Sequence, residues 1–282
     1  MKIIAVQIIT DSTCDLLPED IARLGVTVVP LTVHFEDASY RDGVDITKEQ
    51  FYEKLEASAQ LPSTSMVPPG EFVQAFEPFV AAGDEVLGLF ISSEISGTYH
   101  SACIARENFP EDKVFVLDSR SASLSLGLLV TEAVRFRDAG HSAADIANLM
   151  QPLIQKIRFF AAVNTLKYLR KGGRISATSA IVGEMLGIKP IVSIIDGTIH
   201  PVGKARGMAS AIDHMLQEAK KNLPNLNYGL VIGHSAAPEL RDKAIAAMKT
   251  PLKLKSWICC EVGATIGTYG GRGCVGLAYI AE

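Results

Sequence analysis

The sequence predicts an α/β protein of two domains, a Rossmann-like domain with a parallel sheet followed by a smaller α+β domain. In the first half, short β-rich runs alternate with helical patterns, which is typical of a parallel sheet covered by helices. In the second half this alternation ends, and an Asp-Gly turn joins two β-rich runs. A chain of 282 residues exceeds what one core usually organises. We therefore expect an α/β domain over 1–159 and an α+β domain over 160–282.

The elements of the first half follow from periodicity and flanking turn residues. Strands are expected at 3–9, 26–33, 85–91 and 114–117. Helices are expected at 18–24, 47–57, 70–81, 96–108, 121–139 and 142–155. Thr47 and Gln50 have the spacing of a capping box, which indicates where the second of these helices begins.

The elements of the second half predict antiparallel or mixed strand pairing. Asp196-Gly197 between the runs 191–195 and 198–202 is a strong hairpin signal. Further strands are expected at 228–233, 255–262 and 275–281, and helices at 208–222 and 238–248.

Composition and charge exclude several classes of function. A formal charge of −4 with 21% charged residues gives no general attraction to nucleic acid. The apolar runs are too short to span a bilayer, and the amino terminus lacks a signal-peptide pattern, so we expect a cytoplasmic protein. The five cysteines are scattered and form no CxxC pair, so we expect reduced thiols and no metal site. The phosphate-loop motif G-x-x-x-x-G-K-[ST] is absent, and we expect no cofactor.

Small polar residues follow several strands, where ligands gather in open parallel sheets. The run from Ser92 to Thr98 leads into a helix whose first N–H groups lack intrahelical partners, so this helix start could bind an anion. Capping of the helix by Ser96 is the plainer alternative. The hydroxyls of Thr64 and Ser65 could donate to the same anion, or their loop could simply precede another helix.

Two clusters of cations can likewise be interpreted either as functional or as structural features. Residues 167–174 carry four cations around a glycine pair, and Lys204 and Arg206 follow the predicted hairpin. Either cluster could serve a ligand or partner, or could be a solvated helix end.

A hydrolase built on Ser96 is a further hypothesis, because His100 lies four residues later on the same helical face. No G-x-S-x-G elbow surrounds a serine, however, and no third group orients this histidine.

Taken together, the motifs of this sequence resemble those of the DegV family of bacterial fatty-acid-binding proteins. The resemblance extends nearly from end to end. It is carried by Thr10-Asp11-Ser12, by Tyr40-Arg41-Asp42-Gly43, by Thr64-Ser65, by the run 92–99, by the run 168–175, by Gly203-Lys204-Ala205-Arg206 and by the run 263–268.

The resemblance implies a protein that binds a long-chain fatty acid and has no catalytic residue of its own. The acyl chain would enter a tunnel, and the carboxylate would be held between the two domains. Thr64 and Ser96 would donate hydrogen bonds to the carboxylate, with Ser65 and the Gly97 N–H nearby. Arg174 would support that site electrostatically.

The resemblance also implies a protein partner. In similar proteins the partner is an ATP-dependent fatty acid kinase, related to dihydroxyacetone kinases, which converts the bound carboxylate to an acyl phosphate. Arg206 would belong to the surface that faces this kinase.

One motif departs from the family pattern. Tyr269 stands where the family usually has a histidine beside the carboxylate, and Arg272 stands where it has a proline. A phenol can donate one hydrogen bond but does not titrate near neutral pH. We expect Tyr269 to contact the carboxylate. The alternatives are a stand-alone serine esterase or phosphatase built on Ser96 and a binding protein for a small phosphorylated metabolite.

Overall fold

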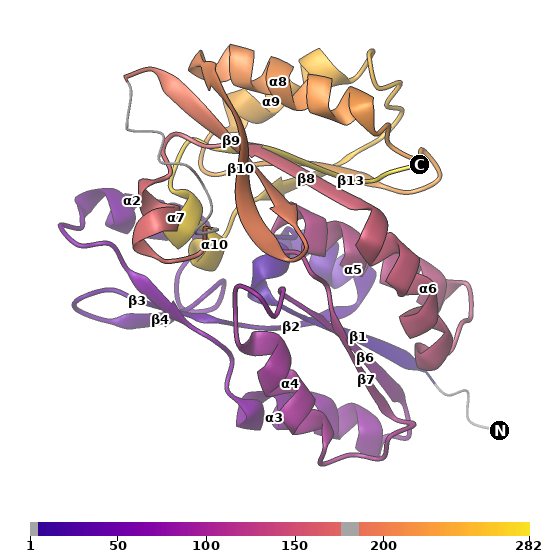
Figure 1. Ribbon diagram of the computed structural model, residues 1–282. Helices are drawn as coiled ribbons and strands as arrows, with labels where there is room; N and C mark the ends of the chain where they lie inside the picture. Colours follow the sequence, from indigo (N-terminus) through magenta and orange to yellow (C-terminus); the bar gives the residue numbers. More distant parts are fainter. Residues whose placement is uncertain (1–4, 176–185) are drawn as a thin grey trace.

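The computed structural model describes residues 5–175 and 186–282. A four-stranded parallel sheet organises the first half, with strand order β2-β1-β6-β7 (Figure 1). Its strands are β1 (Val6–Asp11), β2 (Val26–Val29), β6 (Glu85–Phe90) and β7 (Val114–Asp118). β1 and β6 occupy the centre and are almost entirely buried, as their apolar composition predicts.

Helices cover both faces of this sheet. On one face lie α1 (Pro18–Leu24), α5 (Leu124–Asp138) and α6 (Ala143–Lys156), which pack on Ile8, Leu87 and Leu89. On the other face lie α3 (Pro69–Ala81) and α4 (Thr98–Arg106), which pack on Ile9 and Phe90. A short 3-10 turn, η1 (Ser12–Cys14), follows β1.

A six-stranded mixed sheet organises the second half, with strand order β10-β9-β8-β13-β11-β12. All its pairs are antiparallel except β11 with β12. Its strands are β8 (Ile157–Ala162), β9 (Ile188–Ile195), β10 (Thr198–Arg206), β11 (Leu230–His234), β12 (Ile258–Glu261) and β13 (Val275–Ile280). The helices α8 (Gly207–Lys221) and α9 (Pro238–Met248) cover one face, and α5 packs against the other (Figure 1). The α/β class and the mixed second sheet are thus confirmed.

The helix α5 lies between the two sheets and joins them through one core. Its residues Leu124 and Leu128 share a buried cluster with Leu87 of the first sheet and with Val231 and Ala278 of the second. The division of the chain near residue 160 stays a prediction, and β8 begins at Ile157.

A third, small sheet differs from the prediction of one strand over 26–33. Pro30 has no N–H for a sheet hydrogen bond, and the chain leaves the first sheet there. It continues as β3 (Thr32–His34), which pairs with β4 (Ser39–Arg41) and β5 (Ser63–Ser65). The helix α2 (Lys48–Ala57), with the expected Thr47–Gln50 capping box, packs on this sheet through Phe51.

Two short helices and the strands β4, β5 and β8 were not predicted. The helices α7 (Lys167–Lys171) and α10 (Ala264–Gly270) span only five and seven residues, too few for a clear periodicity. The strand β8 follows α6 directly, without turn residues to mark the change. No helix among residues 5–175 and 186–282 is long and apolar enough to cross a bilayer.

Candidate functional site

A cavity of about 250 Å³ lies between the two sheets. Loops at the carboxyl ends of the first sheet form one wall, including Ile91 and Ala122. Strands β8, β9, β11 and β13 and the helix α10 form the facing wall. The cavity is thus close to the position at which an open parallel sheet usually binds ligands.

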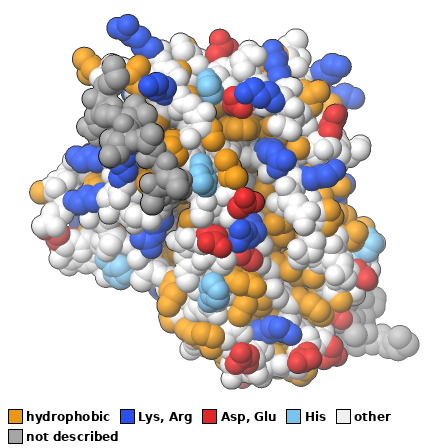
Figure 2. Space-filling view, in the orientation of Figure 1, with side chains coloured by type: hydrophobic (Ala, Val, Ile, Leu, Met, Phe, Trp, Pro, Cys, Tyr) orange, Lys and Arg blue, Asp and Glu red, His pale blue; other side chains and the backbone are white. Residues whose placement is uncertain are grey.

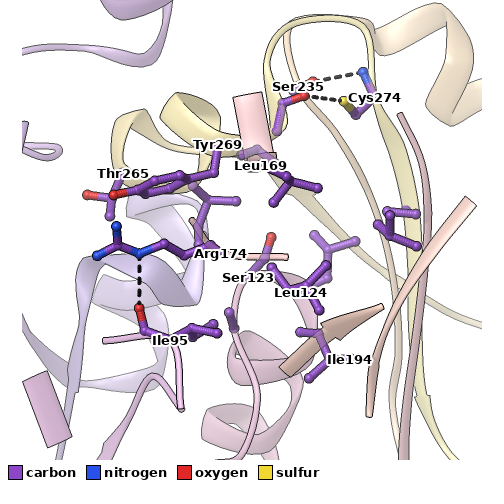
Figure 3. Close-up of a pocket in the computed structure, with 18 of the residues that line it drawn as sticks. Ile95, Ser123, Leu124, Leu169, Arg174, Ile194, Ser235, Thr265, Tyr269 and Cys274 are labelled. Atoms are coloured by element: carbon purple, nitrogen blue, oxygen red, sulfur yellow. Dashed lines mark hydrogen bonds between the residues drawn. The ribbon is translucent and has the colours of Figure 1, made fainter. Parts of the chain in front are cut away.

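Most of the cavity wall is apolar (Figure 3). It includes Leu124, Leu169, Phe159, Val192, Ile194 and Ile199. Gly233 and Gly276 bring α5 close to the second sheet, because a Cβ atom at either position would lie 2.4 or 2.8 Å from a methyl group of Leu124. The apolar part of the wall is therefore formed by regular, closely packed elements.

Polar groups from four separate segments gather at one end of the cavity, and we call Thr64, Ser96, Arg174 and Tyr269 the polar end. The hydroxyls of Thr64 on β5 and Tyr269 on α10 are 2.6 Å apart, although 205 residues separate them. The guanidinium carbon of Arg174 lies 5.1 Å from the centre of the Tyr269 ring. Figure 3 shows these two side chains one above the other, and all four residues are half-buried.

Tyr269 is held in place by its neighbours on two sides. A Cβ atom at Gly172 would lie 2.4 Å from the Tyr269 ring, so only glycine allows this close approach. Arg174 donates a hydrogen bond of 2.7 Å to the Gly172 carbonyl, which ties the loop after α7 to the same place.

Two buried carboxylates hold the start of α10. Asp15 accepts a hydrogen bond from the Gly263 N–H at 2.7 Å and another from the Ser123 hydroxyl at 2.6 Å. Asp42 accepts hydrogen bonds from the N–H groups of Ala264 and Thr265, each at 3.0 Å. Burial raises the pKa of Asp15 to about 7. The first sheet and the small sheet thus jointly position the helix that carries Tyr269.

Ser96 serves the helix start and the cavity at once. The helix begins at Thr98, two residues later than expected, with Gly97 as its N-cap. The Ser96 hydroxyl lies 3.3 Å from the Thr98 N–H and 2.9 Å from the Thr98 hydroxyl, so it does help to cap the helix. Ser96 and Gly97 nevertheless both line the cavity. The two interpretations of this serine do not exclude each other.

One residue expected near the carboxylate, Ser65, lies outside the cavity. Side chains alternate along β5, so Thr64 faces the cavity while Ser65 faces the other way and is 3.0 Å from a ring nitrogen of His34. Ser65 is therefore not a cavity residue. Arg206, which was expected on a surface that faces a partner, is exposed at the end of β10 and does not line the cavity.

Sequence reasoning missed several polar residues of the cavity wall, namely Ser123, His234, Ser235 and Thr265. His234 accepts a hydrogen bond from the Ala237 N–H, and burial lowers its pKa to about 4, so this histidine is neutral. A signal for Thr265 was available, because it precedes Tyr269 by four residues and a helix places such residues on one face.

Fold and site together define an α/β protein with two large sheets, one small sheet, and an apolar cavity that has a cluster of hydroxyls and one guanidinium at its end. The family model described as "Uncharacterised protein, DegV family" matches residues 5–282. A DegV domain-containing protein of Caldanaerobacter subterraneus subsp. tengcongensis is 35% identical and aligns over 97% of this chain and 98% of its own. The chain therefore belongs to the DegV family.

Solved structures agree with this assignment. A fatty-acid-binding DegV family protein of Thermus thermophilus has a TM-score of 0.88 and 29% identity, over 99% of this chain and 100% of that one. A stearic-acid-binding protein of Eubacterium ventriosum has a TM-score of 0.88 and 28% identity, over 98% of each chain.

Proposed function

We propose that this protein binds a long-chain fatty acid in the cavity, with the carboxylate at the polar end and the acyl chain along the apolar wall. The observation that carries the proposal is the combination, in one cavity, of a mostly apolar wall and a cluster of hydroxyls and a guanidinium at one end. A fatty acid combines an apolar chain and a polar head group in the same way. The relatives described as fatty-acid-binding proteins support the same ligand class.

The energetics of such a complex favour tight binding. Burial of an acyl chain contributes about 0.8 kcal/mol per methylene, so a palmitate-sized chain gains roughly 10 kcal/mol before the costs of ordering. The carboxylate loses hydration, which the donors at the polar end offset through charge-assisted hydrogen bonds. The hydroxyls of Thr64, Ser96 and Tyr269 and the Gly97 N–H are these donors, and Arg174 supplies the positive charge.

The two alternative functions have less support. An esterase would need a base beside Ser96, but among the described residues this hydroxyl is paired with Thr98, and no histidine hydrogen bonds to it. A small phosphorylated metabolite would leave the apolar wall unused.

We further propose that the bound carboxylate is presented to an ATP-dependent fatty acid kinase. The residues of the polar end are half-buried, so a partner can reach a carboxylate held there. The exposed Arg206, together with Lys167 and Lys171 on α7, offers positive charge to a partner with an acidic surface. Figure 2 shows Lys and Arg side chains on the left of this face, the side on which α7 lies in Figure 1.

The binding proposal is tested with a double variant, Thr64→Val with Ser96→Ala, and with Ser65→Ala as the matched control. Calorimetric titration with palmitate is expected to give a Kd roughly a hundredfold weaker for the double variant, since two charge-assisted hydrogen bonds are lost. Ser65→Ala is expected to bind as the wild type does, because Ser65 faces away from the cavity. A wild-type protein that does not bind palmitate would refute the proposal.

The kinase proposal has a separate test. Arg206→Glu is expected to slow acyl phosphate formation by an ATP-dependent fatty acid kinase and to leave the Kd for palmitate unchanged. If acyl phosphate forms at equal rates with wild type and variant, Arg206 is not part of the surface that contacts the kinase.

A further inference from the structure

One polar side chain of the cavity wall has no hydrogen-bond partner. Among the described residues, the buried side-chain oxygens and nitrogens without a partner include a single cavity-lining atom, the Thr265 Oγ1. Thr265 is only 2% exposed, so bulk water does not satisfy this hydroxyl. A buried hydroxyl without a partner destabilises a protein, and natural structures contain few of them.

The position of Thr265 in its helix explains why it has no partner. A buried threonine inside a helix usually bonds to the carbonyl four residues earlier, as Thr268 does to the Ala264 carbonyl at 2.9 Å. Thr265 is the second residue of α10, so the residue four positions earlier is Glu261, in β12. The Glu261 carbonyl instead accepts a hydrogen bond from the Lys48 ammonium group.

Thr265 lies beside the polar end of the cavity. It precedes Tyr269 by one helical turn, and a long side chain on a helix leans back toward the preceding turn. Figure 3 shows Thr265 next to the outer end of the Tyr269 ring, on the same side as the guanidinium of Arg174. The other hydroxyls there already have partners, since Thr64 pairs with Tyr269 and Ser96 with Thr98.

We propose that Thr265 is a further ligand-binding residue, whose hydroxyl donates a hydrogen bond to a carboxylate oxygen of the bound fatty acid. This inference rests on the proposed function and adds a contact that neither the motifs nor the cation cluster indicated. A carboxylate accepts several hydrogen bonds, so it can use this donor in addition to Ser96 and to whichever of Thr64 and Tyr269 does not donate to the other. Thr265 thereby favours a charged carboxylate over an uncharged acyl ester.

The test compares Thr265→Val, Thr265→Ser and Thr268→Val. Valine keeps the shape of threonine and removes the hydroxyl, serine keeps the hydroxyl, and Thr268→Val removes a hydroxyl of the same helix that is bonded inside the protein. Each variant is titrated with palmitate and with methyl palmitate. Circular dichroism of each variant verifies that it is folded.

The expected result is a Kd for palmitate about tenfold weaker in Thr265→Val, with a smaller change for methyl palmitate. Thr265→Ser and Thr268→Val are expected to bind palmitate within about threefold of the wild type. If Thr265→Val binds palmitate as the wild type does, or loses equal affinity for both ligands, the inference is overturned while the proposed function stands. A wild-type protein without affinity for palmitate overturns both.

Discussion

The two ends of the cavity are built in different ways. The apolar wall comes mainly from strands of the six-stranded sheet, from α5 and from Leu169 on α7, whose side chains belong to two buried apolar clusters. The polar end comes from β5, α10, the loop after α7 and the loop before α4, which meet through hydrogen bonds between distant parts of the chain. We infer from this comparison that the apolar wall determines the length of acyl chain that the cavity accepts. The polar end determines which head group is bound.

The largest expected effect comes from filling the apolar part of the cavity. Ile194 lines it, while the next residue, Ile195, is 45% exposed. Ile194→Trp is expected to abolish measurable palmitate binding, because the indole occupies space that the acyl chain needs. Ile195→Trp is the control and is expected to leave the affinity unchanged. If the Ile194→Trp variant binds palmitate with wild-type affinity, the acyl chain does not lie in this part of the cavity.

The next effect concerns stability and the anchoring of α10. Asp15 has a pKa of about 7 in the folded protein and about 4 in the unfolded chain, so the folded state binds more protons between these values. The free energy of unfolding is therefore expected to fall as the pH rises from 5 to 8, by about 2.6 kcal/mol from this group alone.

Urea unfolding at pH 5 and pH 8 measures this difference. Asp15→Asn is expected to reduce it without abolishing it, because burial also raises the pKa of Asp11, to about 6. If variant and wild type show the same pH dependence, the raised pKa of Asp15 does not contribute to the loss of stability.

A moderate effect is expected at the guanidinium. Arg174→Met keeps the length of the side chain and removes its charge, so palmitate should bind roughly tenfold more weakly. Arg206→Met, which removes a charge outside the cavity, is the matched control. If both variants bind equally well, the charge beside Tyr269 does not act on the carboxylate.

The smallest effect is expected at Tyr269. Tyr269→Phe removes the hydroxyl that pairs with Thr64 but keeps the ring against Gly172. Other groups of the polar end still contact the carboxylate, so the loss of this one hydroxyl predicts a Kd about threefold to tenfold weaker, measured by the same titration. A loss of more than about a hundredfold would mean that the ring has moved as well.

The comparison of the two ends also explains what the sequence could predict. Hydroxyls, cations and glycines form local motifs that resemble those of the DegV family, so Thr64, Ser96, Arg174 and Tyr269 could be predicted from the sequence, and the structure brings them together. The apolar residues of the cavity could not be identified, since apolar core and apolar wall have the same composition. Ser65 was misplaced because the short strand β5, which sets the direction of its side chain, was not predicted.

The fold, like the site, could be predicted only in part. Elements with strong local signals, such as α2 with its capping box and the Asp196-Gly197 hairpin, were placed correctly. The strand β8 and the helices α7 and α10 were missed, because tertiary packing and the buried carboxylates Asp15 and Asp42 hold them in place. The sequence places Thr265 on the same helical face as Tyr269, but the binding role proposed for Thr265 depends on its unpartnered hydroxyl, which only the structure shows.

The central claim, that the cavity holds a fatty acid, is tested most directly by native mass spectrometry of the purified protein, followed by denaturing extraction and identification of the lipid. We expect a bound species with the mass of a long-chain fatty acid, either copurified or gained on incubation with palmitate or oleate. A protein that stays at its bare sequence mass after both incubations would contradict the claim and favour a different ligand.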